Sequence, residues 1–131
     1  MLLDTSGLMC LFDRRDFRHA DAETFYDTAT TRLTHSYVFA EFVALSNARG
    51  APLIPALEFV ADLQDDEELE VVWVDESLHR EALDFLRERA DKDWSLCDAV
   101  SILLMQRRGI EEALTTDHHF EQAGLRRLLP Q

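Results

Sequence analysis

The sequence predicts a single α/β domain with a mostly parallel sheet, and three observations lead to this prediction. The chain has 131 residues, 47% of them hydrophobic, with only four Gly and three Pro, which is typical of one globular domain. Short apolar segments that end in a carboxylate alternate with longer segments of helical spacing, an order typical of α/β proteins. No repeat, linker or low-complexity tract interrupts them, so we expect residues 1–131 to form one domain.

The first half of the chain predicts two strands and four helices. Residues 1–3 are a buried strand that ends in Asp4, residues 5–7 a turn, and residues 8–12 the start of a helix. A polar loop over 14–19 precedes a helix over 20–30 and a weak strand over 32–34. A helix over 37–48 has Ser36 as its N-cap and Gly50 as its terminator, and Pro55 suits the first turn of a helix that continues to Leu63.

The second half predicts three strands and two helices. The clearest strand of the chain spans 70–75 and follows an acidic loop, and helical spacing resumes over 77–89. Ser95 begins a nearly all-apolar helix over 96–107, which Gly109 ends. Residues 113–116 form another short strand before Asp117, and residues 125–129 form a last edge strand.

Composition excludes several classes of protein. The first residues carry no basic segment and no apolar run is long enough to cross a membrane, so we expect a cytoplasmic protein. Cys10 and Cys97 form no zinc-binding or CxxC spacing, as expected for thiols in a reducing compartment. The net charge of −13 excludes a broad basic surface for nucleic acid. Any anionic substrate must therefore be held by a few arginines or by metal ions.

Two carboxylates follow predicted strands. Asp4 and Asp117 occupy strand ends, and ligands of open parallel sheets bind beyond the carboxyl ends of the strands. The alternative is that each caps the helix that follows it.

Two further carboxylates lie on predicted helices. The neighbours of Glu41 three and four residues away are mostly apolar, which places its carboxylate on an apolar stripe, where it requires a partner, a proton or a metal. The alternative is a glutamate at the edge of the stripe that reaches water. Asp98 begins a buried helix, although Ser95 and Asp98 also fit the S-x-x-D capping box.

A parallel sheet brings these four acids to one edge. Like charges a few ångströms apart repel by roughly 3 kcal/mol per pair at an effective dielectric of 20, so the cluster calls for divalent cations. Carboxylate ligands select Mg²⁺ or Mn²⁺, which assist phosphodiester hydrolysis by orienting water and stabilising the reacting oxygens.

Other residues are assigned structural roles. The pair His118 and His119 lacks the usual ligand spacing and its adjacent side chains are expected to diverge. Asp91 and Asp93 either add a carboxylate to the site or belong to a surface loop. Asp75 is assigned as a helix cap, and Trp73 and Trp94 as core or interface anchors.

Four segments in this order resemble the PIN-domain nucleases, and most closely the VapC-type toxins of bacterial toxin–antitoxin pairs. They are Met1 to Ser6, Ala40 to Phe42, Trp94 to Ala99, and Leu114 to Phe120 followed by Ala123 to Leu125. The resemblance covers essentially the whole chain, and the final H-F-x-x-x-G-L run makes it specific. One departure is Cys97, at a position where the family often has a threonine.

The resemblance implies a three-layer α/β/α domain and a metal-dependent endoribonuclease. It implies that Asp4, Glu41, Asp98 and Asp117 surround Mg²⁺ or Mn²⁺, with Thr5, Ser95 and Thr116 as polar neighbours that orient ligands or water. It also implies a homodimer and a small antitoxin that covers the site.

The acidic net charge leaves the contact with RNA to a few arginines. We expect phosphate contacts from Arg14, Arg15, Arg18 and Arg49, with the alternative that each only balances nearby acids. Two other functions stay open. One is a PIN-like module that binds RNA or protein without cutting, and the other is an RNA-processing nuclease that has no antitoxin.

Overall fold

The computed structural model describes residues 1–131 and has five strands in one parallel sheet, ordered β3-β2-β1-β4-β5. The strands are β1 Leu2–Leu3, β2 Arg32–His35, β3 Leu69–Val72, β4 Glu112–Leu114 and β5 Arg126–Arg127. The helices are α1 Thr5–Phe12, α2 His19–Thr28, α3 Ser36–Ala48, α4 Leu53–Asp65, α5 Glu76–Arg87, α6 Leu96–Arg108 and α7 His119–Gln122. All four strand pairings are parallel, which confirms the predicted α/β class.

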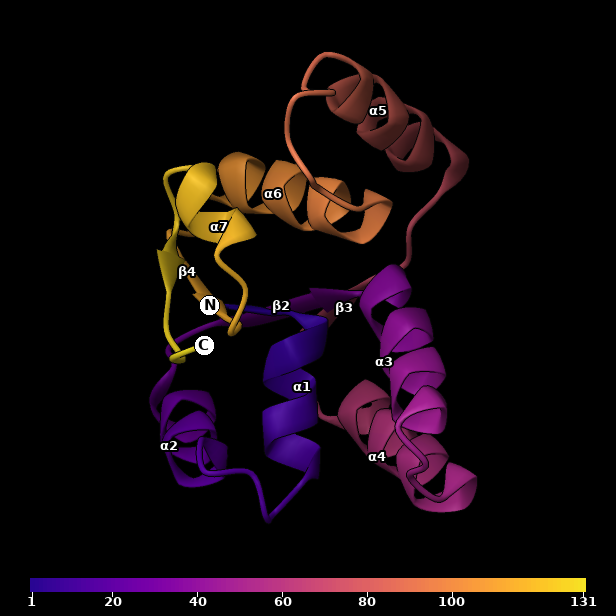
Figure 1. Cartoon of the computed structure of the whole chain (residues 1–131), viewed down its shortest axis with the longest axis vertical. Helices are drawn as coiled ribbons and strands as arrows, with labels where there is room; N and C mark the ends of the chain where they lie inside the picture. The colour runs from indigo at the N-terminus through magenta and orange to yellow at the C-terminus, as the bar shows by residue number, and fades with distance from the viewer.

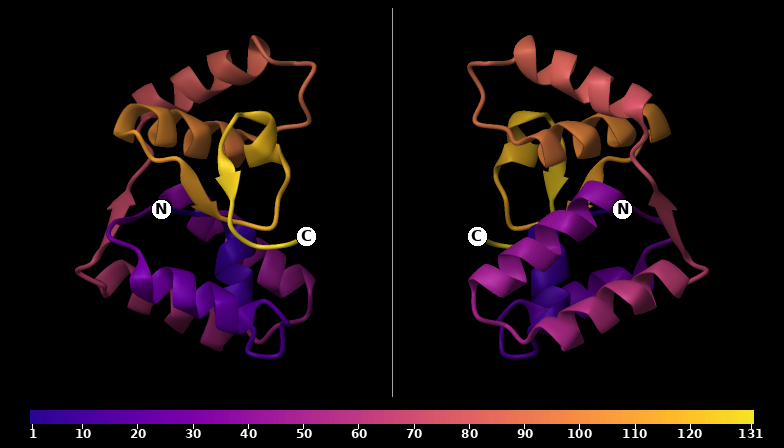
Figure 2. Two further views of the ribbon diagram at one scale, coloured as in Figure 1. Left: turned by 90° about the vertical axis from the view of Figure 1, so that its left-hand side faces the viewer. Right: turned by 90° about the vertical axis from the view of Figure 1, so that its right-hand side faces the viewer.

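The sheet lies between two helical layers, α1 to α4 on one side and α5 to α7 on the other (Figures 1 and 2). Alternation along the short central strands builds both cores. Leu3 and Leu114 belong to the cluster beneath α1 to α4, whereas Leu2 and Ala113 belong to the cluster beneath α5 to α7. Successive side chains of a strand point to opposite faces of the sheet, so a strand that is buried on both faces is apolar at nearly every position. Two or three residues per central strand are therefore enough to contribute to both cores.

Helix α1 packs directly on β4, and Gly7 makes that contact possible. A Cβ atom built on Gly7 would lie 2.0 Å from the carbonyl oxygen of Leu114. Residues 5–7 are therefore not the predicted turn but the first turn of α1. The glycine serves close approach of two backbones rather than chain reversal.

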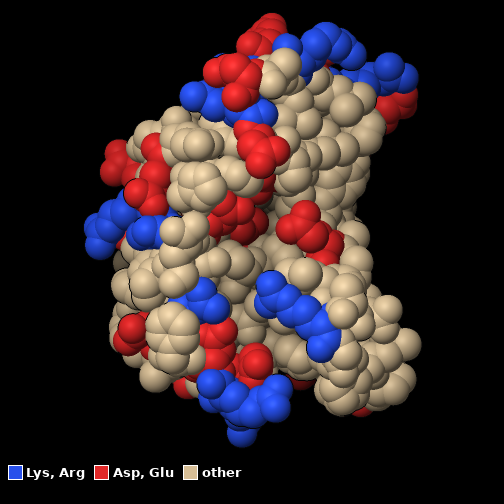
Figure 3. Space-filling view, in the orientation of Figure 1, with Lys and Arg blue, Asp and Glu red and all other residues tan.

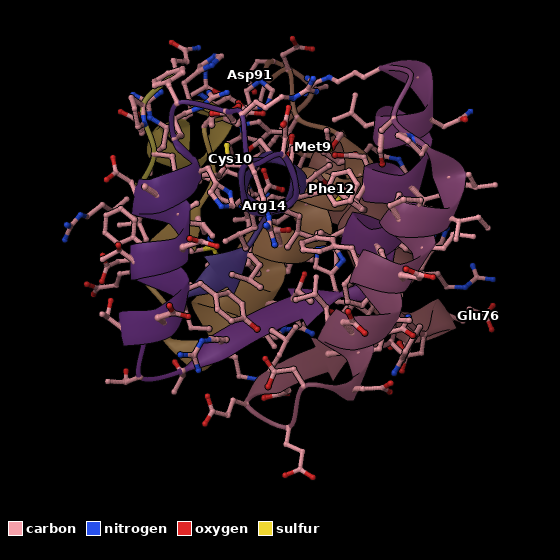
Figure 4. The ribbon with its side chains drawn as sticks, turned by 90° about the horizontal axis from the view of Figure 1, so that it is seen from below. Met9, Cys10, Phe12, Arg14, Glu76 and Asp91 are labelled. Atoms are coloured by element: carbon pink, nitrogen blue, oxygen red, sulfur yellow. The ribbon has the colours of Figure 1, made fainter.

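The far end of α1 packs between the other helices of its layer. Phe12 meets Phe42 of α3 edge-on at 5.5 Å between ring centroids and Phe59 of α4 at 5.3 Å. In a view along α1, Met9 and Phe12 lie on the side of α3 and α4, and Cys10 lies on the opposite side (Figure 4). Arg14 follows α1 at the end of the helix remote from Asp4.

One other local prediction was wrong. Ser36 is the first residue of α3 rather than its N-cap, which is His35, and the Ser36 hydroxyl instead accepts a hydrogen bond from the Val74 amide at 2.9 Å. Of the two roles predicted for Trp73, the structure excludes the core anchor, because Trp73 lies beyond the end of β3 and is 63% exposed, and the interface anchor stays a prediction. Trp94 does stack on Phe85, as an anchor of the α5–α6 layer.

Two predicted caps and one terminator are confirmed. The Asp75 carboxylate accepts the Leu78 amide at the start of α5, and Ser95 and Asp98 form the predicted capping box at the start of α6. Gly109 ends α6 in the left-handed conformation, at φ 64°. No helix combines the length and apolar character needed to cross a membrane.

Candidate active site

A cavity of about 270 Å³ opens where β1 and β4 end and α6 begins, beside the middle of α3. All four acids expected at the site line it. The full lining is Asp4, Thr5, Ser6, Glu41, Leu45, Asp93, Ser95, Asp98, Asp117 and His119. The space-filling view shows acidic side chains gathered near the middle of this face, where the surface is hollowed between the two helical layers (Figure 3).

Asp4 is the most buried of the four acids, with 4% of its surface exposed. It stands at the N-cap position of α1, yet its side chain makes no capping hydrogen bond, which removes the alternative reading of this residue. Burial, followed by the charges of Asp98 and Glu41, raises the pKa of the Asp4 carboxyl to about 7, although the hydrogen bond from Thr115 lowers it. At neutral pH this carboxylate is therefore held at a high free energy that a cation would lower.

Asp98 serves a helix cap and the cavity at once. One oxygen, Oδ2, accepts the Ser95 amide at 3.0 Å, and the Ser95 hydroxyl accepts the Asp98 amide at 3.0 Å. The same residue lines the cavity and is 7% exposed. The predicted alternatives, a cap or a site residue, are thus not exclusive, because a carboxylate has two oxygens and each accepts more than one hydrogen bond.

A chain of hydroxyls connects the loop after β4 to Asp4. The Thr115 hydroxyl donates to Asp4 Oδ2 at 2.8 Å and accepts the Asp117 amide at 3.0 Å. The Ser6 hydroxyl contacts Thr115 Oγ1 at 3.0 Å and accepts the Thr116 amide at 2.9 Å. These bonds fix the backbone that carries Asp117 relative to Asp4.

Of the three polar neighbours expected from the resemblance, two line the cavity and one does not. Ser95 and Thr5 line the cavity, and the Thr5 hydroxyl is buried without a hydrogen-bond partner. Thr116 contributes only its backbone, and Thr115 supplies the hydroxyl that touches the acids. β4 ends at Leu114, two residues earlier than predicted, and a shift of one residue in an extended segment exchanges the two faces.

Glu41 lines the cavity from an exposed flank of α3, not from the buried apolar stripe that its sequence neighbours indicate. Its side chain is exposed, and so are Ala40 and Ala44 on the same flank of α3. The buried face of this helix consists of Val38, Phe39, Phe42 and Ser46. The prediction of a desolvated carboxylate on an apolar stripe is wrong, because no other element covers this flank. Glu41 lies at the rim of the cavity, in contact with solvent.

His119 is the main residue of the cavity that sequence reasoning missed. Its Nδ1 lies 3.1 Å from Asp98 Oδ2 and 3.2 Å from Asp117 Oδ2. The histidine pair was set aside because adjacent side chains diverge, but α7 begins at His119 and its first turn directs this imidazole back toward the acids. Asp93, one of two acids considered for an additional carboxylate, also lines the cavity. Ser6 and Thr115 carried no signal in the sequence beyond their nearness to Asp4 and Asp117.

The arginines expected to contact RNA lie apart from the acids. Arg15 and Arg49 line a second cavity, of about 400 Å³, at the far ends of α1 and α3. Arg18 is engaged with both carboxylate oxygens of Asp16 and with the Pro130 carbonyl. Arg14 and Arg49 make no ion pair, whereas Arg15 pairs with Asp13. Of the four, Arg49 and Arg14 are therefore the cations left open to a phosphate.

Comparison with known proteins identifies the class. The PIN domain model matches residues 1–125, and the chain therefore belongs to the PIN-domain family. PIN nucleases generally use a divalent metal ion, as the donor set of the cavity suggests.

The relatives are more specific. Two proteins named 23S rRNA-specific endonuclease VapC20, from two strains of Mycobacterium tuberculosis, are each 26% identical over 132 residues, covering 100% of this chain and 99% of their own. The crystal structure of M. tuberculosis VapC20, a sarcin-ricin loop cleaving toxin, matches with a TM-score of 0.86 and 25% identity over 98% of each chain. The expected PIN-domain family, the parallel α/β fold and the enzyme class, an endoribonuclease, are confirmed, and the chain is similar to VapC20 over its whole length.

Proposed function

We propose that this protein is the toxin of a toxin–antitoxin pair and hydrolyses structured RNA with Mg²⁺ or Mn²⁺ held by Asp4, Glu41, Asp98 and Asp117. The observation that carries the proposal is the convergence of these four carboxylates on one cavity at the carboxyl end of the parallel sheet. The named target of the relatives, a loop of 23S rRNA, supports a structured RNA as the substrate.

The donor set fits a hard divalent cation. Oxygen ligands from carboxylates are those that Mg²⁺ and Mn²⁺ prefer. The raised pKa of Asp4 is caused by burial and by two neighbouring carboxylates, and a cation among them relieves both. When bound, the cation supplies positive charge that stabilises the developing charge on phosphate oxygens.

The residues of the chain divide the remaining work. Asp4 and Asp98 are nearly buried and rigidly hydrogen-bonded, so they define the position of the cation. Thr115 and Ser6 fix the loop that presents Asp117. Glu41 is exposed at the rim, on the side open to RNA, and its carboxylate is placed to accept a hydrogen bond from the attacking water.

Arg49 and Arg14 are proposed as phosphate contacts for RNA that leaves the cavity. Helix α1 has 8 residues and is therefore about 12 Å long, so the cations beyond its far end are separated from the acids by the length of this helix. Each such contact adds to affinity without reading sequence. We expect Arg49→Gln to weaken RNA binding and to lower its salt dependence by roughly one counterion.

We further propose a homodimer and a small antitoxin as the protein partners. The apolar side chains left exposed on α4, Leu53, Ile54 and Leu57, together with Trp73 beyond β3, offer surface for such contacts. Light scattering of the purified chain tests the homodimer, and co-expression with the product of an adjacent short reading frame tests the antitoxin.

The deciding experiment is cleavage of a mixed pool of structured RNAs in EDTA, Mg²⁺ or Mn²⁺. The variants are Asp4→Asn, Asp98→Asn and Glu41→Gln, and the matched control is Glu58→Gln, an exposed glutamate on the neighbouring α4. We expect metal-dependent cutting by the parent and the control and none by the three site variants. Because Glu41 is exposed, Glu41→Gln should leave the free energy of unfolding within about 0.5 kcal/mol of the parent.

Any of three results would contradict a part of the proposal. Cutting by Glu41→Gln equal to that of the parent removes this residue from the site. Absence of cutting under every condition, with a melting temperature that metal does not change, favours the non-catalytic module. Cutting without any antitoxin in the genome neighbourhood favours the processing nuclease.

A further inference from the structure

The imidazole of His119 is held between two acids of the cavity. Its Nδ1 lies 3.1 Å from Asp98 Oδ2 and 3.2 Å from Asp117 Oδ2, and only 16% of its side chain is exposed. The His119 amide donates to the other oxygen of Asp117 at 3.0 Å. This bond turns the Asp117 carboxylate toward the imidazole, so three donor atoms from α6, α7 and the loop before α7 converge.

The contact between His119 and Asp98 is a hydrogen bond in the absence of an ion, and the same separations suit ligands around a single ion. Nitrogen and oxygen ligands at about 2.1 Å from a tetrahedral or octahedral ion lie about 3.0 to 3.4 Å from each other. An imidazole with two carboxylates is a donor set for transition ions of borderline hardness, whereas Mg²⁺ prefers oxygen alone. Three protein ligands with an open fourth position are also the usual number in accessible zinc sites.

His118 supplies a fourth donor at the rim. Its Nδ1 lies 3.6 Å from Asp117 Oδ1, its ring centroid is 4.7 Å from that of His119, and 54% of its side chain is exposed. Ligand atoms of Asp117, His118 and His119 all lie within 4.8 Å of one another. Because His118 is exposed, its ring is free to rotate toward an ion already held by the other residues.

The nearby thiol does not compete for such an ion. Cys97 precedes Asp98 and is buried. It is not among the residues that line the cavity, so its thiol is not placed to bind an ion held there.

We propose that Asp98, Asp117 and His119, with His118 at the rim, form a binding site for a borderline divalent ion, with Zn²⁺ as the probe. The site adjoins the oxygen donors of Asp4 and Glu41. Binding of Zn²⁺ does not depend on the proposed function, whereas its effect on cleavage does: Zn²⁺ bound here withdraws Asp98 and Asp117 from the Mg²⁺ or Mn²⁺ site and so inhibits cleavage.

The test is competition of the full-length, metal-free protein with a chromophoric zinc indicator in excess Mg²⁺. We expect one Zn²⁺ per chain. His119→Gln should weaken Zn²⁺ binding by more than about tenfold, since even residues that only orient a ligand contribute that much, and His118→Gln by a smaller factor. The matched control is His79→Gln, on α5 and hydrogen-bonded to Tyr37 outside this cavity, which should bind as the parent does.

Asp4→Asn separates the two metal sites, because Asp4 belongs only to the oxygen site. This variant should keep its affinity for Zn²⁺, with folding of every variant verified by circular dichroism. Parent and His119→Gln with equal Zn²⁺ affinity would overturn the proposal, as would loss of Zn²⁺ binding in Asp4→Asn alone. RNA cleavage in Mg²⁺ is measured separately, with and without Zn²⁺. Cleavage without zinc tests the nuclease by itself, and cleavage that Zn²⁺ does not slow in the parent would overturn the inferred inhibition.

Discussion

Replacing Asp4 by asparagine should stabilise the metal-free protein while abolishing its activity. The carboxyl group is 4% exposed, and burial together with the charges of Asp98 and Glu41 raises its pKa from 3.8 to about 7. Asparagine has nearly the same shape and keeps an oxygen that accepts the Thr115 hydroxyl. The substitution therefore removes the buried charge and little else.

The magnitude follows from linkage between protonation and folding. Between the unfolded pKa of 3.8 and the folded pKa of about 7, the folded state binds more protons, so stability falls as the pH rises through this window. A difference of about 3 pKa units corresponds to roughly 4 kcal/mol at 1.36 kcal/mol per unit. For a chain of this length we expect Asp4→Asn to melt roughly 7 to 15 °C above the parent near pH 8, for a gain of about 2 to 4 kcal/mol.

The assay is thermal unfolding in EDTA across pH 4 to 8, followed by circular dichroism. The parent should lose stability relative to Asp4→Asn as the pH rises and should be level with it near pH 4. Added Mg²⁺ or Mn²⁺ should raise the melting temperature of the parent only, because ions stabilise the state that binds them. Equal melting temperatures of the two proteins near pH 8 in EDTA would refute the claim that Asp4 carries a strained charge.

Three further predictions test the surroundings of the site. Thr115→Val deletes the hydroxyl between Asp4 and Asp117 and should lower the free energy of unfolding in urea by about 1 to 3 kcal/mol, whereas Thr116→Val should change it little. A larger loss in Thr116→Val than in Thr115→Val would show that the Thr116 hydroxyl, not that of Thr115, supports the acids. Gly7→Ala should lower stability by more than about 2 kcal/mol, because its Cβ meets the backbone of β4. Gly124→Ala, strained only by a φ of 79°, should lose about 1 kcal/mol, and equal melting temperatures of these two variants would contradict the close approach. Burial lowers the pKa of His35 from 6.5 to about 3, so the stability present above pH 6.5 falls as the pH drops toward 3. In His35→Gln this loss of stability between pH 6.5 and pH 4 should be smaller by about 3 kcal/mol. An equal loss in the parent and the variant would show that His35 is not the buried neutral group.

The acidic net charge is compatible with an RNA substrate once the site is seen in place. The carboxylates that contribute to the charge of −13 include the four that would hold cations, and bound cations reverse the sign of the local field. Arg49 and Arg14 carry no ion pair and lie beyond the ends of the same two helices that frame the acids. Salt dependence of RNA binding should therefore be shallow, since few phosphates are neutralised.

The fold class and most of the acid cluster could be predicted from patterns in the sequence. Short apolar segments ending in Asp4 and Asp117 predict parallel strands whose carboxyl ends meet, and this inference needs only the alternation of strands and helices. The capping box at Ser95 and Asp98 and the left-handed end of α6 at Gly109 are local features, and local hydrogen bonds are encoded within a few residues.

Which surfaces are covered depends on how the helices and strands pack together. Spacing along α3 places Glu41 beside apolar residues, but whether that flank is buried depends on a neighbouring element, and none packs there. The same reason explains the exposed Trp73, which follows an edge strand that no helix covers. The choice of Thr115 over Thr116 and the return of His119 to the acids depend on where β4 ends and α7 begins. Such boundaries are set by packing against the rest of the fold, because an extended segment alternates its faces at every residue and a shift of one position exchanges them.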